Sequence, residues 1–118
     1  MKENPIMSKS EDFALHIVSL YQYLVNEKKE FILSKQILRS GTSIGANVAE
    51  SNRAQSKADF YSKLNIALKE ADETSYWLRL LSKSGYIPQD KYSFLYEENE
   101  EIIRILVSIT KNQKDNDT

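Results

Sequence analysis

The sequence predicts an all-α protein, an antiparallel up-and-down four-helix bundle that self-associates. Apolar residues recur at steps of three and four positions in four separate segments, and no segment shows the strict alternation of a β-strand. The segments are joined by short connections, which is typical of helices that pack as antiparallel neighbours. The 118 residues are expected to form a single domain over positions 1–118, with a polar tail at about 111–118.

The first two helices are expected at about residues 10–26 and 33–52. Ser8 and Glu11 have the spacing of a capping box at the start of the first helix, and Ser34 is the expected cap of the second. The face of the first helix that should be buried carries five apolar residues: Phe13, Ile17, Leu20, Tyr21 and Leu24.

The third and fourth helices are expected at about residues 57–84 and 88–109. Ser56, followed three positions later by Asp59, resembles a helix start. Gly85 is placed to end the third helix in the left-handed conformation. Pro88 then suits the first position of the fourth helix, where its missing N–H does no harm.

The second helix carries very small residues between its apolar positions. Gly41 and Gly45 both lie inside it, and an interior glycine costs a helix about 1 kcal/mol relative to alanine. This cost needs a compensating reason. We expect that the two glycines allow the backbone of another helix to approach closely.

The composition excludes several classes of function. The chain has no Cys, which removes disulfides, thiolate metal sites and thiol catalysis. Its N-terminal residues contain no apolar run typical of a signal peptide, and no stretch approaches the ~20 apolar residues of a membrane span. We therefore expect a cytoplasmic protein that has no contact with a membrane. The net charge of −1 gives the whole molecule no strong preference for nucleic acid.

The third helix has a second apolar strip in addition to the stripe that faces the core. Both strips cannot face a single four-helix core, and large exposed apolar patches usually mark contact surfaces. The strip is therefore predicted to be an oligomer interface, formed by Ile66, Glu73, Tyr76, Trp77 and Leu80. The alternative is that its aromatic groups cover the ends of the bundle.

Glu73 lies among the apolar residues of this strip, where a carboxylate needs a cation or several N–H donors. Arg39 and Arg53 are the candidate partners. The predicted polar network consists of Ser43, Asn47, Glu50 and Glu73, and we expect it to fix the register of helices at an interface. Contact with an anion or with nucleic acid is an alternative for these residues. A catalytic role is not expected, because no nucleophile or second tuned group accompanies them.

Positive charge is concentrated between residues 28 and 63. This segment contains seven basic and three acidic residues, whereas residues 90–101 contain five acidic residues and one Lys. The basic residues form either a solvated helix face or a surface that meets an anionic partner. On the second interpretation the candidate nucleic-acid contacts are Lys28, Lys29, Lys35, Arg39, Arg53, Lys57 and Lys63.

The sequence assigns no catalytic, cofactor-binding or metal-binding residue. His16 is the single histidine and is expected at the surface, since the Glu-x-x-His motif of a di-iron bundle does not occur. Gly41 and Gly45 lie inside an amphipathic helix with no strand before them, so they do not form a nucleotide-binding loop.

The runs SKQILRSGTSIGANVAE and IALKEADETSYWLRLL resemble the bacterial four helix bundle protein family. This family includes proteins encoded in intervening sequences of 23S ribosomal RNA genes. The chain is also similar to the accessory variability protein of diversity-generating retroelements. The resemblance covers about residues 13–109 and rests on Ser43-Ile44, Asn47-Val48-Ala49-Glu50, Ala67 and Glu73.

The resemblance implies a four-helix protomer, a ring-shaped homopentamer and no established enzyme activity. The retroelement relatives bind nucleic acid and a reverse transcriptase through a basic ring surface. The chain departs from this pattern in two respects. Ser51 stands where the commoner family sequence has Gly. The sequence pI of 5.9 contrasts with the strongly basic nucleic-acid-binding relatives.

Two hypotheses for the function follow. The preferred one is a non-enzymatic, homo-oligomeric scaffold or ribonucleoprotein accessory that contacts RNA or DNA. The alternative is a protein-binding adaptor in which the Trp77 strip receives an amphipathic helix of a partner, with no role in nucleic-acid binding. An enzyme with a site around Glu50 and Glu73 at an oligomer interface is a third and weaker hypothesis.

Overall fold

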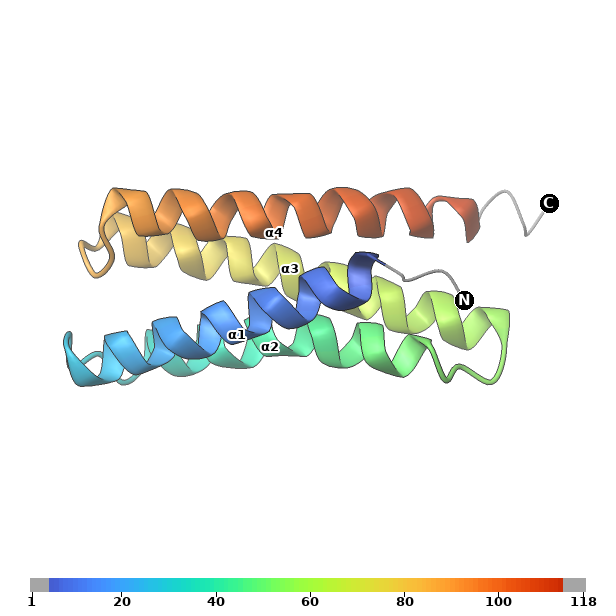
Figure 1. Cartoon of the computed structure of the whole chain (residues 1–118), viewed down its shortest axis with the longest axis horizontal. Coiled ribbons are helices and arrows are strands. Elements are labelled where there is room, and N and C mark those ends of the chain that lie inside the picture. Colours follow the sequence, from blue (N-terminus) through green and yellow to red (C-terminus); the bar gives the residue numbers. More distant parts are fainter. Residues whose placement is uncertain (1–4, 114–118) are drawn as a thin grey trace.

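The chain forms four α-helices that run alternately up and down the long axis of the molecule (Figure 1). The structure, a computed structural model, describes residues 5–113. The helices are α1 (Pro5–Asn26), α2 (Leu33–Ser51), α3 (Lys57–Lys83) and α4 (Gln89–Thr110). Each helix packs against the next, and α4 returns to contact α1. The predicted four-helix bundle is confirmed, and the last five residues of the predicted polar tail lie outside the described part of the chain.

Helix α1 already includes Pro5, so the predicted start at about residue 10 and the capping box of Ser8 and Glu11 are wrong. The hydroxyl of Ser8 lies within the helix and donates to the carbonyl of Pro5 at 3.3 Å. Proline is well tolerated in the first turn of a helix. The added turn also extends the amphipathic face, because it buries Ile6 to 1% exposure.

Helix α2 is capped by a residue that lies ahead of it. The carboxylate of Glu30 accepts hydrogen bonds from the backbone N–H groups of Ser34 at 2.7 Å and of Ile32 at 3.2 Å. Ser34, the predicted cap, is instead the second residue of the helix. Its buried hydroxyl has no hydrogen-bond partner among residues 5–113. The prediction for Ser34 is therefore wrong, and Glu30 takes the capping role.

The boundaries of α3 follow the predicted signals. The Ser56 hydroxyl accepts a hydrogen bond from the N–H of Asp59 at 3.0 Å. Gly85 has a φ of 81°, and the next residue, Tyr86, donates its N–H to the carbonyl of Leu81 at 2.9 Å. Both predictions are confirmed. Pro88 differs slightly from its prediction, because it is the extended residue just before α4 rather than the first helical one.

The core lies along the axis of the bundle and receives apolar side chains from all four helices. The two glycines of α2 allow α1 to approach, as predicted. A Cβ atom at Gly41 would lie 2.8 Å from Cγ1 of Ile17, and one at Gly45 would lie 3.2 Å from the carbonyl oxygen of Ser10. Both distances are shorter than ordinary contact, so a larger residue requires the Ile17 side chain to shift at position 41 and the backbone of α1 to give way at position 45.

Buried polar side chains link α3 to both of its neighbours. The hydroxyl of Thr74 donates to that of Ser40 on α2 at 2.9 Å. The amide of Asn99 on α4 donates to the carbonyl of Ala71 and to the hydroxyl of Ser75, each at 2.8 Å. A buried polar group without a partner is costly, so these bonds favour one register of the helices over others.

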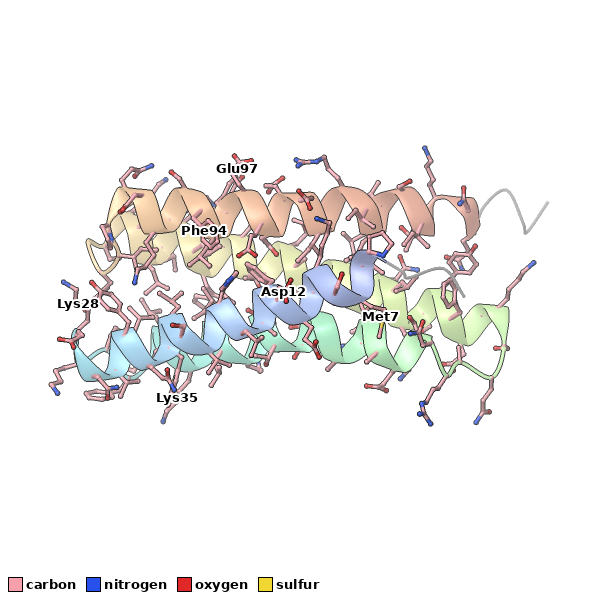
Figure 2. All side chains as sticks on the ribbon, in the orientation of Figure 1. Met7, Asp12, Lys28, Lys35, Phe94 and Glu97 are labelled. Carbon is pink, nitrogen blue, oxygen red and sulfur yellow. The ribbon has the colours of Figure 1, made fainter. Side chains whose placement is uncertain are left out.

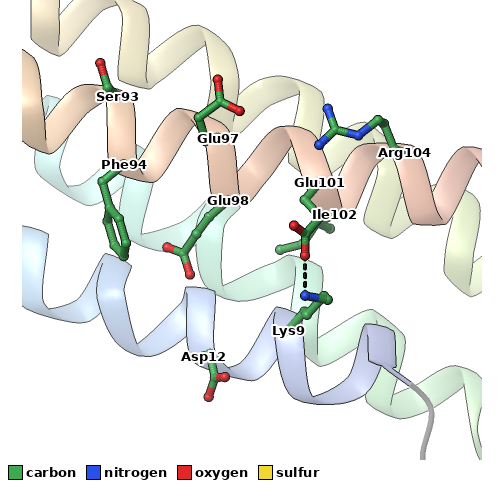
Figure 3. A pocket seen from close by; sticks show the side chains of 9 residues that line it. All are labelled: Lys9, Asp12, Ser93, Phe94, Glu97, Glu98, Glu101, Ile102 and Arg104. Carbon is green, nitrogen blue, oxygen red and sulfur yellow. Dashed lines mark ion pairs between the residues drawn. The ribbon is translucent and has the colours of Figure 1, made fainter.

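The seam between α1 and α4 is packed less extensively than the other three seams. Polar contacts occupy part of it, including an ion pair between Lys9 and Glu101 (Figure 3). In the cyclic order of the helices, this seam lies on the opposite side of the bundle from the seam between α2 and α3.

Candidate interaction surfaces

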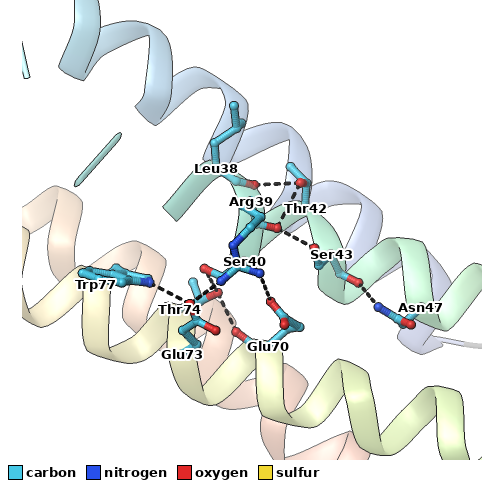
Figure 4. Close-up of polar contacts among 10 residues, drawn as sticks. All are labelled: Leu38, Arg39, Ser40, Thr42, Ser43, Asn47, Glu70, Glu73, Thr74 and Trp77. Carbon is cyan, nitrogen blue, oxygen red and sulfur yellow. Dashed lines mark hydrogen bonds and ion pairs between the residues drawn. The ribbon is translucent and has the colours of Figure 1, made fainter. Parts of the chain in front are cut away.

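Arg39 is the centre of a polar cluster on the outer side of α2 and α3 (Figure 4). Its guanidinium donates to a carboxylate oxygen of Glu70 at 3.0 Å and forms a second ion pair with Glu73. The indole N–H of Trp77 donates to the same oxygen of Glu73 at 3.2 Å. Of the two candidate cations for Glu73, Arg39 is therefore the partner, whereas Arg53 lies beyond the end of α2.

This pairing changes the acidity of both partners. The hydrogen bond from Arg39 lowers the pKa of Glu73, burial opposes that effect, and the bond from Trp77 reinforces it. The carboxylate of Glu73 in turn raises the pKa of Arg39. A carboxylate with a lowered pKa is a weaker base, which suits a structural ion pair better than general acid–base catalysis.

The other members of the predicted polar network make separate contacts. The hydroxyl of Ser43 donates to the backbone carbonyl of Arg39 at 2.6 Å. The side-chain amide of Asn47 donates to the backbone carbonyl of Ser43 at 2.9 Å. Glu50 forms an ion pair with Lys63 at 3.1 Å. The structure thus places Ser43, Asn47, Glu50 and Glu73 along one face without joining them in a single network.

Part of the predicted apolar strip on α3 is exposed. Ile66 is 40% exposed and Tyr76 47% exposed, whereas Trp77 and Leu80 are half-buried. Trp77 packs against the core of the same chain. We use the term "α2–α3 face" for the surface that carries Ile66 and Tyr76 together with the Arg39–Glu73 and Glu50–Lys63 ion pairs. Its apolar groups are bordered by charged pairs, a pattern common at protein–protein contacts.

The predicted nucleic-acid contacts fall into three separate places. Lys28, Lys29 and Lys35 lie at the end of the bundle that holds the connection from α1 to α2, where Figure 2 labels the first and third of them. Arg53 and Lys57 lie at the opposite end, about 27 Å away along α2. Arg39 and Lys63 are engaged in ion pairs on the α2–α3 face. A single protomer therefore presents two small basic ends and no continuous basic surface formed by all seven residues.

Within residues 5–113 no group of three His, Cys, Asp or Glu side chains is arranged to hold a metal ion. The described helices also include none that is long and apolar enough to cross a membrane. His16 lies at the surface, where its Nδ1 atom is 2.8 Å from Oε1 of Glu98 on α4.

The comparison with known families identifies the chain's relatives. Residues 2–108 match the sequence profile described as "23S rRNA-intervening sequence protein". The chain belongs to this family. The family resemblance seen in the sequence is therefore confirmed over almost the whole length of the chain.

A solved relative supports both the family and the fold. A crystal structure from Bacteroides thetaiotaomicron VPI-5482, described as a protein with unknown function from the S23 ribosomal protein family, is 57% identical in sequence. The match has a TM-score of 0.89 and covers 90% of this chain and 98% of that chain. A comparison with curated proteins found no match to the chain.

In this chain, the structure also exposes apolar side chains that the sequence analysis did not single out. They lie on α1, on α4 and in the connection from α1 to α2: Leu15, Val18, Phe31, Ile32, Phe94 and Val107. Phe94 is 55% exposed and faces α1 (Figure 3). The sequence could have indicated the exposure of Phe94, because this residue lies outside the buried stripe of α4, which runs through Leu95, Ile102 and Leu106.

Proposed function

We propose that the chain is a non-enzymatic, homo-oligomeric helical-bundle protein that acts as a cytoplasmic scaffold or ribonucleoprotein accessory. The observation that carries the proposal is the α2–α3 face, where Ile66 and Tyr76 remain exposed beside two interhelical ion pairs. The ion pairs stabilise the arrangement of α2 and α3, so the exposed apolar groups are held in fixed positions. A second copy that covers them would gain the free energy of burying apolar area. The family resemblance suggests five copies in a ring.

Sedimentation velocity with an Ile66→Glu variant tests the self-association. Wild-type protein should sediment as an oligomer at micromolar concentration, and the variant should shift toward the monomer because it places a charge in an apolar contact. Leu15→Glu is the matched control, since it introduces the same charge at an exposed apolar position on α1. A wild-type protein that sediments at its monomer mass of 13.6 kDa would contradict the proposal.

The nucleic-acid part of the proposal rests on the two basic ends. Five basic side chains form no ion pair among the described residues, so their charges are free to meet phosphates. They are Lys28, Lys29 and Lys35 at one end, and Arg53 and Lys57 at the other. One protomer has too few such charges for strong binding, because phosphate contacts dominate nonspecific affinity. An oligomer that aligns equivalent ends would multiply these contacts. The proposed partner is structured RNA, in keeping with the description of the family.

Fluorescence anisotropy with a labelled RNA hairpin at several salt concentrations tests this part. Binding should weaken steeply as salt rises. Replacing Lys28, Lys29 and Lys35 with Ala should reduce the salt slope by roughly 0.7–0.9 for each phosphate contact that is lost. Lys69→Ala, at an exposed position in the middle of α3, is the control. Absence of binding even at low salt would leave only the scaffold function.

The adaptor function makes a different prediction at the same surface. If the exposed strip receives a helix from another protein, Ile66→Glu should abolish capture of that protein while leaving the sedimentation of the free chain unchanged. The half-buried position of Trp77 makes Ile66 the better residue for this test, because a charge at Trp77 would also disturb the core.

A further inference from the structure

A groove runs between α1 and α4, along the seam that is packed least. Its larger part is a hollow of about 570 Å³, and its smaller part, of about 160 Å³, adjoins it at Phe94. Both parts receive side chains from both helices, and Figure 3 shows the larger part. The groove is therefore a property of how α1 crosses α4, and it lies on the opposite side of the bundle from the α2–α3 face.

The groove has an apolar floor and one prominent aromatic side chain. Ile102 lies under the larger hollow, and Leu20 and Leu95 lie under the smaller one. Phe94 lines both and is 55% exposed, with its ring edge-on to that of His16 at a centroid distance of 5.2 Å. Aromatic side chains, Phe among them, are enriched in the buried centres of protein interfaces.

The rims of the larger hollow carry more negative than positive charge. The carboxylates are those of Asp12, Glu97, Glu98 and Glu101, and the cations are those of Lys9 and Arg104. Glu98 and Glu101 are held by contacts across the seam to His16 and Lys9. Asp12 and Glu97 form no ion pair within residues 5–113, and Figure 3 shows them on opposite rims, one on α1 and one on α4.

We propose that this groove binds a basic amphipathic helix of a partner protein. In the larger hollow Lys9 and Asp12 balance each other on α1, whereas three carboxylates outnumber one cation on α4. An apolar floor beside this acidic rim is complementary to a helix whose apolar stripe is bordered by Lys or Arg. The lining residues Ser93 to Arg104 span about 17 Å of α4, which corresponds to about three turns of a bound helix. The acidic rim on α4 disfavours a nucleic acid as the occupant, because it would repel the phosphates.

Fluorescence polarisation with designed peptides tests the proposal on the full chain. The probe is a labelled peptide of Leu and Lys, about 14 residues long, with Leu at helical spacing. Two controls are the same peptide with Glu in place of Lys, and a peptide of the same Leu and Lys composition with strict alternation. The helical Leu–Lys peptide should bind measurably more tightly than both controls. Equal binding of the two Leu–Lys peptides would overturn the proposal, because it would indicate adsorption by charge alone.

Variants of the chain locate the binding. Phe94→Ala should weaken binding of the helical peptide about tenfold or more, as expected when an anchoring aromatic group is truncated. Val107→Ala removes an apolar group that is similarly exposed on α4 but does not line the groove, and should leave the affinity within about twofold. Equal effects of the two variants would overturn the proposal.

A second pair of variants tests the charge complementarity without altering the aromatic group. Combined Asp12→Asn and Glu97→Gln should weaken binding and reduce its dependence on salt, whereas combined Glu11→Gln and Asp72→Asn, at exposed positions outside the groove, should not. Unchanged binding in the first pair would overturn the charge argument. Sedimentation of Phe94→Ala without peptide tests whether a second copy occupies the groove: loss of an oligomer there would also overturn the proposal.

Discussion

At the scale of single residues, Glu73 and Arg39 make the clearest titratable pair. The bond from Arg39 lowers the pKa of Glu73, so the pairing stabilises the folded state above the ordinary Glu value of about 4.3 and is lost as the pH falls through the lower folded value. We expect Arg39→Met to raise the pKa of Glu73 toward its ordinary value, as measured by carboxyl NMR titration. The loss of stability at neutral pH should stay below about 1 kcal/mol, because the pair is partly exposed.

Arg53→Met is the control for this titration. Arg53 was the other candidate partner of Glu73 and forms no ion pair in the described part of the chain. The pKa of Glu73 should therefore stay unchanged in that variant. A shift of equal size in both variants would mean that general charge, and not the specific bond from Arg39, sets the acidity of Glu73.

Gly41 supports a second prediction at the residue scale. A Cβ atom at position 41 would lie 2.8 Å and 2.9 Å from the two γ-carbons of Ile17, which is fully buried. Overpacking of this kind costs about 1–3 kcal/mol, and the gain in helix propensity from Gly to Ala returns about 1 kcal/mol of it. Gly41→Ala should therefore lower the free energy of unfolding in urea, at fixed protein concentration.

A variant of the contacting residue, Ile17→Ala, provides the matched background for the Gly41→Ala test. In an Ile17→Ala protein the two γ-carbons are absent, so the same Gly41→Ala change should be neutral or stabilising. The difference between the two backgrounds is the interaction energy of a double-mutant cycle. An equal cost in both would show that position 41 requires Gly for a reason other than contact with Ile17.

At the scale of the helices, the start of α2 depends on Glu30. Its carboxylate accepts hydrogen bonds from the N–H groups of Ile32 and Ser34, which would otherwise lack helical partners. Glu30→Ala should lower the free energy of unfolding by about 1–2 kcal/mol, the usual cost of losing a cap. Ser34→Ala should have little effect or stabilise, because the buried hydroxyl has no hydrogen-bond partner in the described structure. Urea unfolding monitored by circular dichroism measures both.

If Ser34→Ala were the more damaging of the two changes, Ser34 would be the true cap and the geometry at Glu30 would be incidental. Glu30→Gln refines the result. It keeps an oxygen acceptor but removes the charge, so its cost separates the hydrogen bond from the attraction between a carboxylate and the positive end of the helix.

The contrast between Glu30 and Ser56 shows which parts of the elements could be predicted. Ser56 follows the common pattern in which a hydroxyl just before a helix accepts from an N–H three residues later. Glu30 reaches its acceptor position from a connection in which Lys29 has a φ of 53°, an unusual conformation that no local pattern indicated. The helix-forming periodicity was visible in the sequence, whereas this cap depends on the path of the connecting chain.

The same distinction holds for the candidate surfaces. The pairing of Glu73 with a cation was predictable, because a carboxylate among apolar residues needs one, and Arg39 was among the candidates. The groove at Phe94 was not predictable, because it arises from the way α1 crosses α4. Periodicity along a single helix gives no information about how far two helices separate.

At the scale of the whole molecule, the bundle is a rod with two different long sides. Its principal extents are 49, 24 and 21 Å, and its radius of gyration of 15.1 Å exceeds the value of about 13.5 Å typical of a compact domain of this length. A long, thin bundle has little core for its surface, which leaves apolar groups such as Ile66 and Phe94 exposed on both sides. Because the α2–α3 face and the α1–α4 groove lie on opposite sides, the two can be occupied at the same time.

This geometry predicts that the two surfaces can be disabled separately. Ile66→Glu should disrupt the oligomer and leave the affinity for the helical Leu–Lys peptide unchanged per protomer. Phe94→Ala should weaken binding of the peptide and leave the sedimentation of the oligomer unchanged. The reason is that residues on opposite sides of the rod share no contacts, and such distant substitutions act independently. Loss of both properties in Phe94→Ala would mean that a second copy occupies the groove. Loss of both in Ile66→Glu would mean that the two surfaces depend on each other.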